Sequence, residues 1–294
     1  MGHALPFVSI VIPVRNDTAR LGLCLEALHR QDFPVERYEI LVVDNGSHES
    51  PAAVVSRFPR ARFLNEPLPA ADRARNTGIR AARGEVFGFT DSDCVPRSDW
   101  IRLGVDRLGQ YSPPGLVAGR IDVTAHDPKK PTLAELHDLV LAFPQQRCVR
   151  RSHYGATANL FTHREVFEAV GLFREDYGGD AEWGQRVHRS GRQVVYADEV
   201  RVSHPAKETV AELMARTRRG AGVLVNWRRA QPLVLVRDQL KDLVPPPDFV
   251  WKILSTPVLP SASSRVRIFM LFIGLRQVRF WERLRVLGGG DPVR

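Results

Sequence analysis

The sequence has little cysteine. Cys24, Cys94 and Cys148 are the only three in 294 residues, and no CxxC or mixed Cys/His spacing typical of a metal site is present. An odd number of scattered cysteines is not the pattern of a disulfide-stabilised secreted domain. We therefore expect a reducing, cytoplasmic location.

Long hydrophobic runs are also missing. No stretch approaches the roughly 20 apolar residues that a helix needs to cross a bilayer. The first residues, "MGHALPFVSIVIPV", contain neither a charged leader segment nor a small-residue cleavage site. We interpret them as the first strand and not as a signal peptide. Internal repeats and low-complexity tracts are absent as well.

A third absence concerns nucleic-acid binding. The formal net charge is +9, which is compatible with nucleic acid, anionic lipid or a phosphorylated substrate as a partner. However, the chain has no nucleic-acid-binding motif, and no aromatic residues alternate with its basic residues on a strand-like segment. We expect no nucleic-acid partner.

What the sequence does contain is an alternation of strand and helix signals in its first half. Apolar runs typical of buried strands occur at 7–14, 38–47, 61–65 and 85–91. Helical patterns separate these runs, and this order predicts an α/β fold whose parallel sheet is covered by helices on both faces.

Local signals mark the ends of those helices. Asp17 or Thr18 is expected to cap the first helix, whose leucines recur at helical spacing. Pro51 fits the first position of the second helix. The third pattern, "ADRARNTGIRAARG" over 71–84, is expected to end at Gly84.

The order changes beyond residue 115. Strands are expected in 115–125 and 155–163, with a helix near 132–143 between them, and the pattern then gives a helix over 180–191 and one or two strands over 193–204. After Pro205 the pattern is helical and basic, with a break at "VPPPDF". This predicts an α/β domain over 1–207 and a basic helical C-terminal extension over 208–294.

Polar residues cluster where three of the strands end. They form "PVRN" (13–16), "DNGS" (44–47) and "DSD" (91–93), and a helix carrying Arg75 leads into the third cluster. Ligands of open parallel sheets bind outside the carboxyl ends of the strands. Carboxylates for ribose and for a hard divalent cation, with arginine for phosphate, suit a nucleoside diphosphate.

These segments resemble family 2 glycosyltransferases of GT-A fold. The resemblance rests on "VSIVIPVRN", "EILVVDNGS", "ARNTGIRAARGEVFGFTDSD" and "GGDAEWGQRVHRSG", which occur in the family's order and cover roughly residues 7–205. It implies a mixed, mainly parallel sheet flanked by helices. It also implies a metal-dependent, inverting transfer of sugar from a nucleoside-diphosphate sugar.

The resemblance also assigns roles to residues. Asp44 would contact the nucleobase, Arg75 the phosphates or ribose, and Asp91 the ribose. Asp93 would ligate Mg²⁺ or Mn²⁺, and His204 would add to that metal site. The full set expected to bind the donor is Pro13, Arg15, Asn16, Asp44, Asn45, Arg75, Asn76, Asp91 and Ser92.

The catalytic base has two candidates. Asp180 aligns with the general base of the family's Glu-Asp motif, but Gly179 stands where the glutamate of that motif usually occurs. Glu182 is therefore the second candidate. Because one base and direct attack predict inversion at the anomeric carbon, either residue is compatible with an inverting reaction.

Substrate and reaction class are only partly determined. Asp44 favours a uridine-diphosphate sugar without fixing it, and no residue pattern identifies the acceptor. Neither the QxxRW motif nor the spanning helices of processive synthases are present, so we expect transfer of a single sugar. A sugar nucleotidyltransferase is a weaker alternative because "PVRNDTARL" has no glycine-rich phosphate loop. A non-catalytic module that binds nucleotide sugars or membranes is the other alternative.

The C-terminal segment 265–290 has an apolar arc flanked by arginines. The arc comprises Ile268, Leu271, Phe272, Leu275 and Val278. Two interpretations remain open. One is a basic amphipathic helix lying on an anionic membrane at its cytoplasmic face, and the other is a helix that docks its apolar arc on the catalytic domain.

Overall fold

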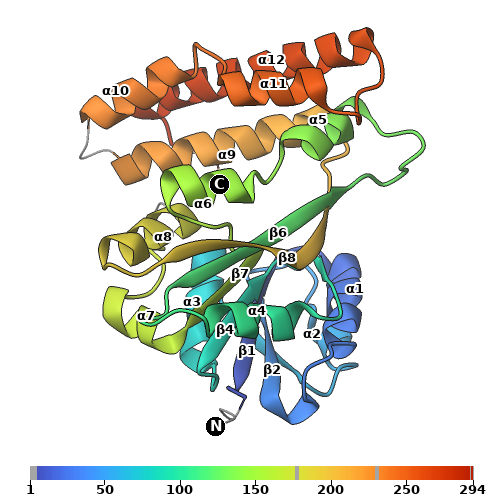
Figure 1. Ribbon diagram of the computed structural model, residues 1–294, viewed down its shortest axis with the longest axis vertical. Helices are drawn as coiled ribbons and strands as arrows, with labels where there is room; N and C mark the ends of the chain where they lie inside the picture. The colour runs from blue at the N-terminus through green and yellow to red at the C-terminus, as the bar shows by residue number, and fades with distance from the viewer. Residues whose placement is uncertain (1–4, 176–178, 229–231, 292, 294) are drawn as a thin grey trace. The chain divides into compact units, whose positions relative to one another are not determined.

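The structure is a computed structural model that describes the whole chain except residues 1–4, 176–178, 229–231, 292 and 294 (Figure 1). The chain divides into two compact units. The first comprises Met1–Asp122, Pro144–Glu175 and Gly179–His204, and the second contains Val123–Phe143 and Pro205–Arg294. The domain boundary near residue 207 stays a prediction.

The centre of the first unit is an eight-stranded sheet in the order β3-β2-β1-β4-β7-β6-β8-β5. Its parallel part consists of β1 (Val8–Val14), β2 (Tyr38–Asp44), β3 (Ala61–Asn65) and β4 (Val86–Thr90). Every residue of β1, β2 and β4 is buried. Burial on both faces explains why these strands appear in the sequence as continuous apolar runs, and the four predicted strands are confirmed.

Helices follow the first three strands, as predicted. They are α1 (Thr18–His29), the short α2 (Ala52–Val55) and α3 (Ala71–Ala81). In α1 the expected leucines, Leu21, Leu25 and Leu28, are buried. Pro51 stands one position before the first residue of α2, so the predicted start was one residue early.

The predicted end of α3 at Gly84 was wrong, because the helix ends at Ala81. Gly84 has a different structural requirement. A Cβ atom at this position would lie 2.6 Å from the backbone nitrogen of Ser9, at the edge of β1. The glycine is needed for this close approach of two backbones and not for a helix cap.

The remainder of the sheet is mixed. It contains β5 (Val95–Pro96), β6 (Leu116–Thr124), β7 (Asn159–His163) and β8 (Val194–Pro205). Strand β7 runs antiparallel to both β4 and β6, and β5 runs antiparallel to β8. The segment 193–204 therefore forms one strand, the first of the two predicted possibilities.

Four more helices belong to the first unit. Helix α8 (Gly179–Arg189) was expected, whereas α4 (Trp100–Leu108), α6 (Gln145–Ser152) and α7 (Arg164–Val170) were not. Helix α4 has an apolar face with Trp100, Ile101 and Val105 buried. Its pattern was therefore present in the sequence, but it is only nine residues long.

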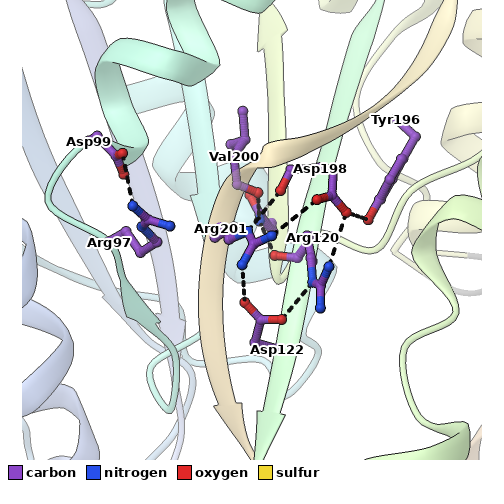
Figure 2. A network of polar contacts seen from close by, with 9 residues as sticks. Arg97, Asp99, Arg120, Asp122, Tyr196, Asp198, Val200 and Arg201 are labelled. Carbon is purple, nitrogen blue, oxygen red and sulfur yellow. Dashed lines mark hydrogen bonds and ion pairs between the residues drawn. The ribbon is translucent and has the colours of Figure 1, made fainter. Parts of the chain in front are cut away.

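Strands β6 and β8 carry a network of opposite charges (Figure 2). Arg120 donates to Asp122 at 2.6 Å and to Asp198 at 3.2 Å, and Arg201 forms an ion pair with Asp198 at 3.1 Å. The Tyr196 hydroxyl donates to the same Asp198 carboxylate at 2.8 Å. Several of these groups are solvent-exposed, so we expect the network to orient neighbouring strands more than it stabilises the fold.

The second unit is helical. It consists of α5 (Leu133–Leu141), α9 (Val210–Arg228), α10 (Pro232–Lys241), α11 (Pro247–Ser255) and α12 (Ala262–Leu287). The predicted break at "VPPPDF" (244–249) begins between α10 and α11, and its last three residues start α11. Among the described residues, no helix has both the length and the apolar character needed to span a membrane.

The predicted apolar arc of α12 packs on protein. Ile268 and Phe272 belong to a buried cluster with Val140 and Leu141 of α5, while Leu275 packs with Leu213 of α9. Of the two interpretations of this arc, the structure supports packing against the protein. Helix α5 lies within residues 1–207, the predicted catalytic region.

Candidate active site

The carboxyl ends of β1 and β2 are joined by side chains of the loops that follow them. Asn16 has a left-handed backbone (φ 54°), and its side-chain oxygen accepts the His48 N–H at 2.8 Å. The Asn16 N–H donates to the Ser47 hydroxyl at 2.9 Å. This arrangement leaves Arg15 exposed next to it, whereas Pro13 is buried within β1.

Asp44 and Asn45 are both buried at the end of β2. The Asp44 carboxylate accepts the Ser47 N–H at 3.1 Å, and the Asn45 amide donates to the carbonyl of Leu68 at 2.9 Å. These contacts fix the loop before any ligand binds. The roles of both residues in donor binding stay predictions.

Arg75, on α3, is a central charge of the site. Its guanidinium lies 3.0 Å from Asp72 and 3.0 Å from Asp91, and the arginine is buried. Burial alone would lower the pKa of Arg75, but the neighbouring Asp91, Asp72 and Asp180 raise it, so the guanidinium stays charged. Its Nε–H is buried, and among the described residues it has no hydrogen-bond partner.

Asp91, Ser92 and Asp93 form the loop after β4. Asp91 faces Arg75, whereas the Asp93 carboxylate lies 3.5 Å from Nε2 of His204 on β8. Asp93 and His204 are both largely shielded from solvent, with 13% and 6% of their side chains exposed. The two aspartates therefore serve different partners, and Ser92 between them is buried.

The surroundings of Asp93 fit a divalent cation. Potential ligand atoms of Asp93, Cys94 and His204 all lie within 4.8 Å of one another. Burial raises the pKa of the Cys94 thiol well above its usual range. Of these groups, the Asp93 carboxylate and the His204 imidazole suit Mg²⁺ or Mn²⁺, together with oxygens that a diphosphate would supply.

Asp180 lies in the first turn of α8 and accepts the N–H of Thr157 at 3.2 Å. Burial, together with the nearby Asp72 and Asp91 charges, raises the pKa of Asp180 to about 6, although Arg75 and the Thr157 N–H act in the opposite direction. A carboxylate with this pKa is well suited to accept a proton near neutral pH.

Glu182, the other candidate base, is held in an ion pair. Both of its oxygens accept from Nε of Arg186, at 2.9 and 3.0 Å, and its side chain is only 7% exposed. Arg186 also donates to the carbonyl of Leu172 at 2.7 Å. This geometry ties α8 to the preceding loop and leaves Glu182 little freedom to move a proton.

Asn76, like Glu182, makes contacts that hold neighbouring segments together. Its side chain donates to the Phe173 carbonyl at 2.8 Å and to Glu175 at 3.1 Å, and its oxygen accepts the Phe173 N–H. The amide therefore holds the segment leading to α8 against α3. Direct donor binding by Asn76 stays a prediction.

Asp72 is a charged residue of this site that the sequence interpretation missed. Besides contacting Arg75, its carboxylate lies where a side chain at Gly179 would begin, 3.0 Å from an ideal Cβ. Burial raises the pKa of Asp72. The available signal was the three-residue spacing from Arg75, which places both on one side of a helix.

Comparisons with known proteins identify the family of this chain. The sequence model described as Glycosyl transferase family 2 matches residues 9–171. Glycosyltransferase AglE of Haloferax volcanii is 32% identical over 234 residues, which cover 77% of this chain and 76% of that protein. Validoxylamine A glucosyltransferase of Streptomyces hygroscopicus subsp. jinggangensis is 28% identical over 64% of this chain and 52% of its own length.

A solved structure has the same fold. It is the mannosyltransferase PcManGT from Pyrobaculum calidifontis, in complex with GDP-Man and Mn²⁺, with a TM-score of 0.66 and 19% identity. The alignment covers 95% of this chain and 87% of that one. This similarity confirms the expected GT-A fold, and with the sequence matches it leads to one conclusion. The chain belongs to glycosyl transferase family 2 and is a glycosyltransferase.

Proposed function

We propose that this enzyme transfers a single sugar from a nucleoside-diphosphate sugar to an acceptor hydroxyl, with inversion at the anomeric carbon and with a divalent cation. The observation that carries the proposal is that one site contains a candidate metal site, a buried arginine and a carboxylate with a raised pKa. Asp93 and His204 form the candidate metal site, Asp180 is the candidate base, and the buried Arg75 contacts both Asp72 and Asp91.

The donor side would hold the diphosphate. Asp93 and His204 would bind Mg²⁺ or Mn²⁺, which neutralises charge on the departing diphosphate when bound. Arg75 offers a fixed cation, and the Asp91 carboxylate beside it can accept from a ribose hydroxyl. PcManGT in complex with GDP-Man and Mn²⁺ supports a nucleotide-sugar donor and a metal here. Preference for a uridine diphosphate remains a prediction from Asp44.

The acceptor side would supply the base. Asp180 takes the proton of the acceptor hydroxyl while that oxygen attacks the anomeric carbon. The bond from this carbon to the diphosphate oxygen breaks, and its electron pair leaves with the nucleoside diphosphate. Attack opposite the leaving group produces the inversion. We assign this role to Asp180 because the ion pair of Glu182 with Arg186 is structural.

The test is turnover of a panel of nucleotide sugars with Mn²⁺, with Mg²⁺ and with a chelator. We expect turnover that needs a metal and that Asp93→Ala abolishes, while the melting temperature stays close to that of the unchanged protein. Cys94→Ser should retain turnover. Metal-independent turnover, or an active Asp93→Ala variant, would refute the metal assignment, and binding without turnover of any donor would favour a non-catalytic module.

A further inference from the structure

Helix α12 has apolar side chains on two opposite faces. Ile268, Phe272 and Leu275 pack inside the second unit. At 3.6 residues per turn, Val266, Met270, Trp281 and Leu284 all fall on the other side of the helix. Val266, Met270 and Trp281 are each more than 60% exposed. The predicted apolar arc is therefore covered by protein, and a second apolar face remains exposed to solvent.

Helices α10 and α11 repeat this arrangement. On α10, Leu235 is buried, whereas Leu233, Val236 and Leu240 recur at helical spacing on the other face and are exposed. On α11, Ile253 is buried while Trp251 and Leu254 are exposed. Isolated exposed apolar residues are normal, but this set extends over three helices and is of the kind that marks an interaction surface.

The three helices lie together. Gln239 on α10 donates to the carbonyl of Phe280 on α12 at 2.9 Å, and Phe249 of α11 stacks on Phe272 of α12. Figure 1 shows α10, α11 and α12 grouped on one side of α9. We refer to their exposed apolar side chains together as the α10–α12 surface.

Positive charge is concentrated in the same part of the chain. Residues 205–294 contain 16 Lys and Arg against 7 Asp and Glu, a net charge of +9. Residues 1–204 contain 26 of each, so the last 90 residues carry the entire net charge of the protein. Arg237 on α10 and Arg267 on α12 lie exposed beside the apolar faces.

We propose that the α10–α12 surface docks on an anionic lipid bilayer. Its leucine, valine and methionine side chains would enter the boundary between headgroups and acyl chains, and Trp251 and Trp281 suit the headgroup level. The surrounding arginines and lysines would meet lipid phosphates. A second copy of the chain fits less well, because two chains that each carry a net charge of +9 repel each other.

The experiment is co-sedimentation of the full chain with vesicles. We expect the protein to pellet with vesicles of equimolar phosphatidylglycerol and phosphatidylcholine, and much less of it to pellet with vesicles of pure phosphatidylcholine. Added salt should weaken binding. The double variant Met270→Glu/Trp281→Glu should lower the partition coefficient about tenfold or more. Val35→Glu is the control, because Val35 is similarly exposed but lies in the first unit, and this variant should bind as the unchanged protein does.

Two further readouts make the result decisive. The far-UV circular dichroism and the thermal unfolding curve of each variant should match those of the unchanged protein, which shows that lost vesicle binding does not reflect unfolding of the second unit. The proposal is overturned if anionic vesicles fail to bind the protein, or if the double variant binds as well as Val35→Glu does. A dimer in sedimentation velocity that the double variant dissociates, without vesicle binding, would identify a second copy as the occupant instead.

Discussion

At the residue scale, the electrostatics of the site depend on a shortage of positive charge. Arg75 contacts Asp72 and Asp91 directly and also influences Asp180, so three carboxylates share one buried guanidinium. Like charges that are not fully compensated raise each other's pKa values. Burial, together with these incompletely compensated charges, raises the pKa of Asp180 to about 6.

Replacement of Asp180 tests the assignment of the base. We expect Asp180→Asn to bind donor normally, because the substitution preserves shape, but to reduce transfer by about 10²–10⁴-fold, since the amide cannot accept the proton. Transfer rates and donor affinity should be measured separately.

Glu182→Gln is the matched control for Asp180→Asn. It breaks the ion pair with Arg186, so it should lower the melting temperature while transfer persists. If Glu182→Gln abolished transfer and Asp180→Asn did not, the base would be Glu182.

The raised pKa of Asp180 predicts a pH dependence. Transfer should decrease as the pH falls through about 6, because the protonated carboxyl cannot act as a base. The sign for stability is opposite: a carboxyl whose pKa is higher in the folded than in the unfolded protein favours folding at low pH. That contribution is lost as the pH rises from about 4 through about 6. Asp180→Asn should lack both contributions of this carboxyl. The pH profile of the transfer rate checks the first, and denaturant titrations at several pH values check the second.

At the element scale, glycines divide into those that permit a close approach and those that do not. A Cβ at Gly84 would meet backbone atoms of Ser9 and Phe7 within 2.8 Å, whereas one at Gly220, in α9, would meet nothing within 4 Å. Backbone neighbours cannot yield as a flexible side chain can.

Alanine at these two positions should therefore act in opposite directions. Gly84→Ala is expected to lower the free energy of unfolding by about 1–3 kcal/mol through overpacking. Gly220→Ala should raise it by about 0.5–1 kcal/mol, since alanine is the better helix former. Denaturant unfolding of both variants measures the difference, and equal effects would contradict this account of Gly84.

At the scale of the whole molecule, each unit has its own buried core. Strands and helices of the first unit surround a cluster that includes Phe87, Phe89 and Trp183, whereas the second has clusters around Ile253 and Leu213. A chain with two cores need not unfold in a single two-state transition.

Asp138 provides a probe of the second unit. Its buried carboxylate accepts from Arg216 at 2.9 Å and from the Lys207 N–H at 3.1 Å, and its pKa is lowered to about 2: burial raises it, but hydrogen bonds from His137 and Arg216 outweigh burial. We expect Asp138→Ala to destabilise this unit by on the order of 3 kcal/mol, because it leaves charged and backbone donors unsatisfied.

Calorimetry can compare this variant with Gly84→Ala, which acts in the first unit. We expect each substitution to shift mainly the transition of its own unit. A single transition that both substitutions shift equally would show that the chain unfolds as one cooperative body.

The sequence by itself determined the four parallel strands, the helices that follow the first three of them, and the class of the protein. Apolar runs, leucine spacing in α1 and the polar residues after β1, β2 and β4 are local patterns, and each predicts its structure from neighbours in the chain. For the same reason the family resemblance was visible without coordinates.

Only the tertiary structure decided which candidate groups are already paired with, or covered by, other parts of the protein. It pairs Glu182 with Arg186, brings Asp72 beside Gly179, and removes the predicted apolar arc of α12 from solvent. The physical reason is that pKa values, ion pairs and exposure depend on what packs against a residue from distant parts of the chain. Periodicity within a helix shows that a face is apolar, but the partner of that face is chosen by the rest of the fold.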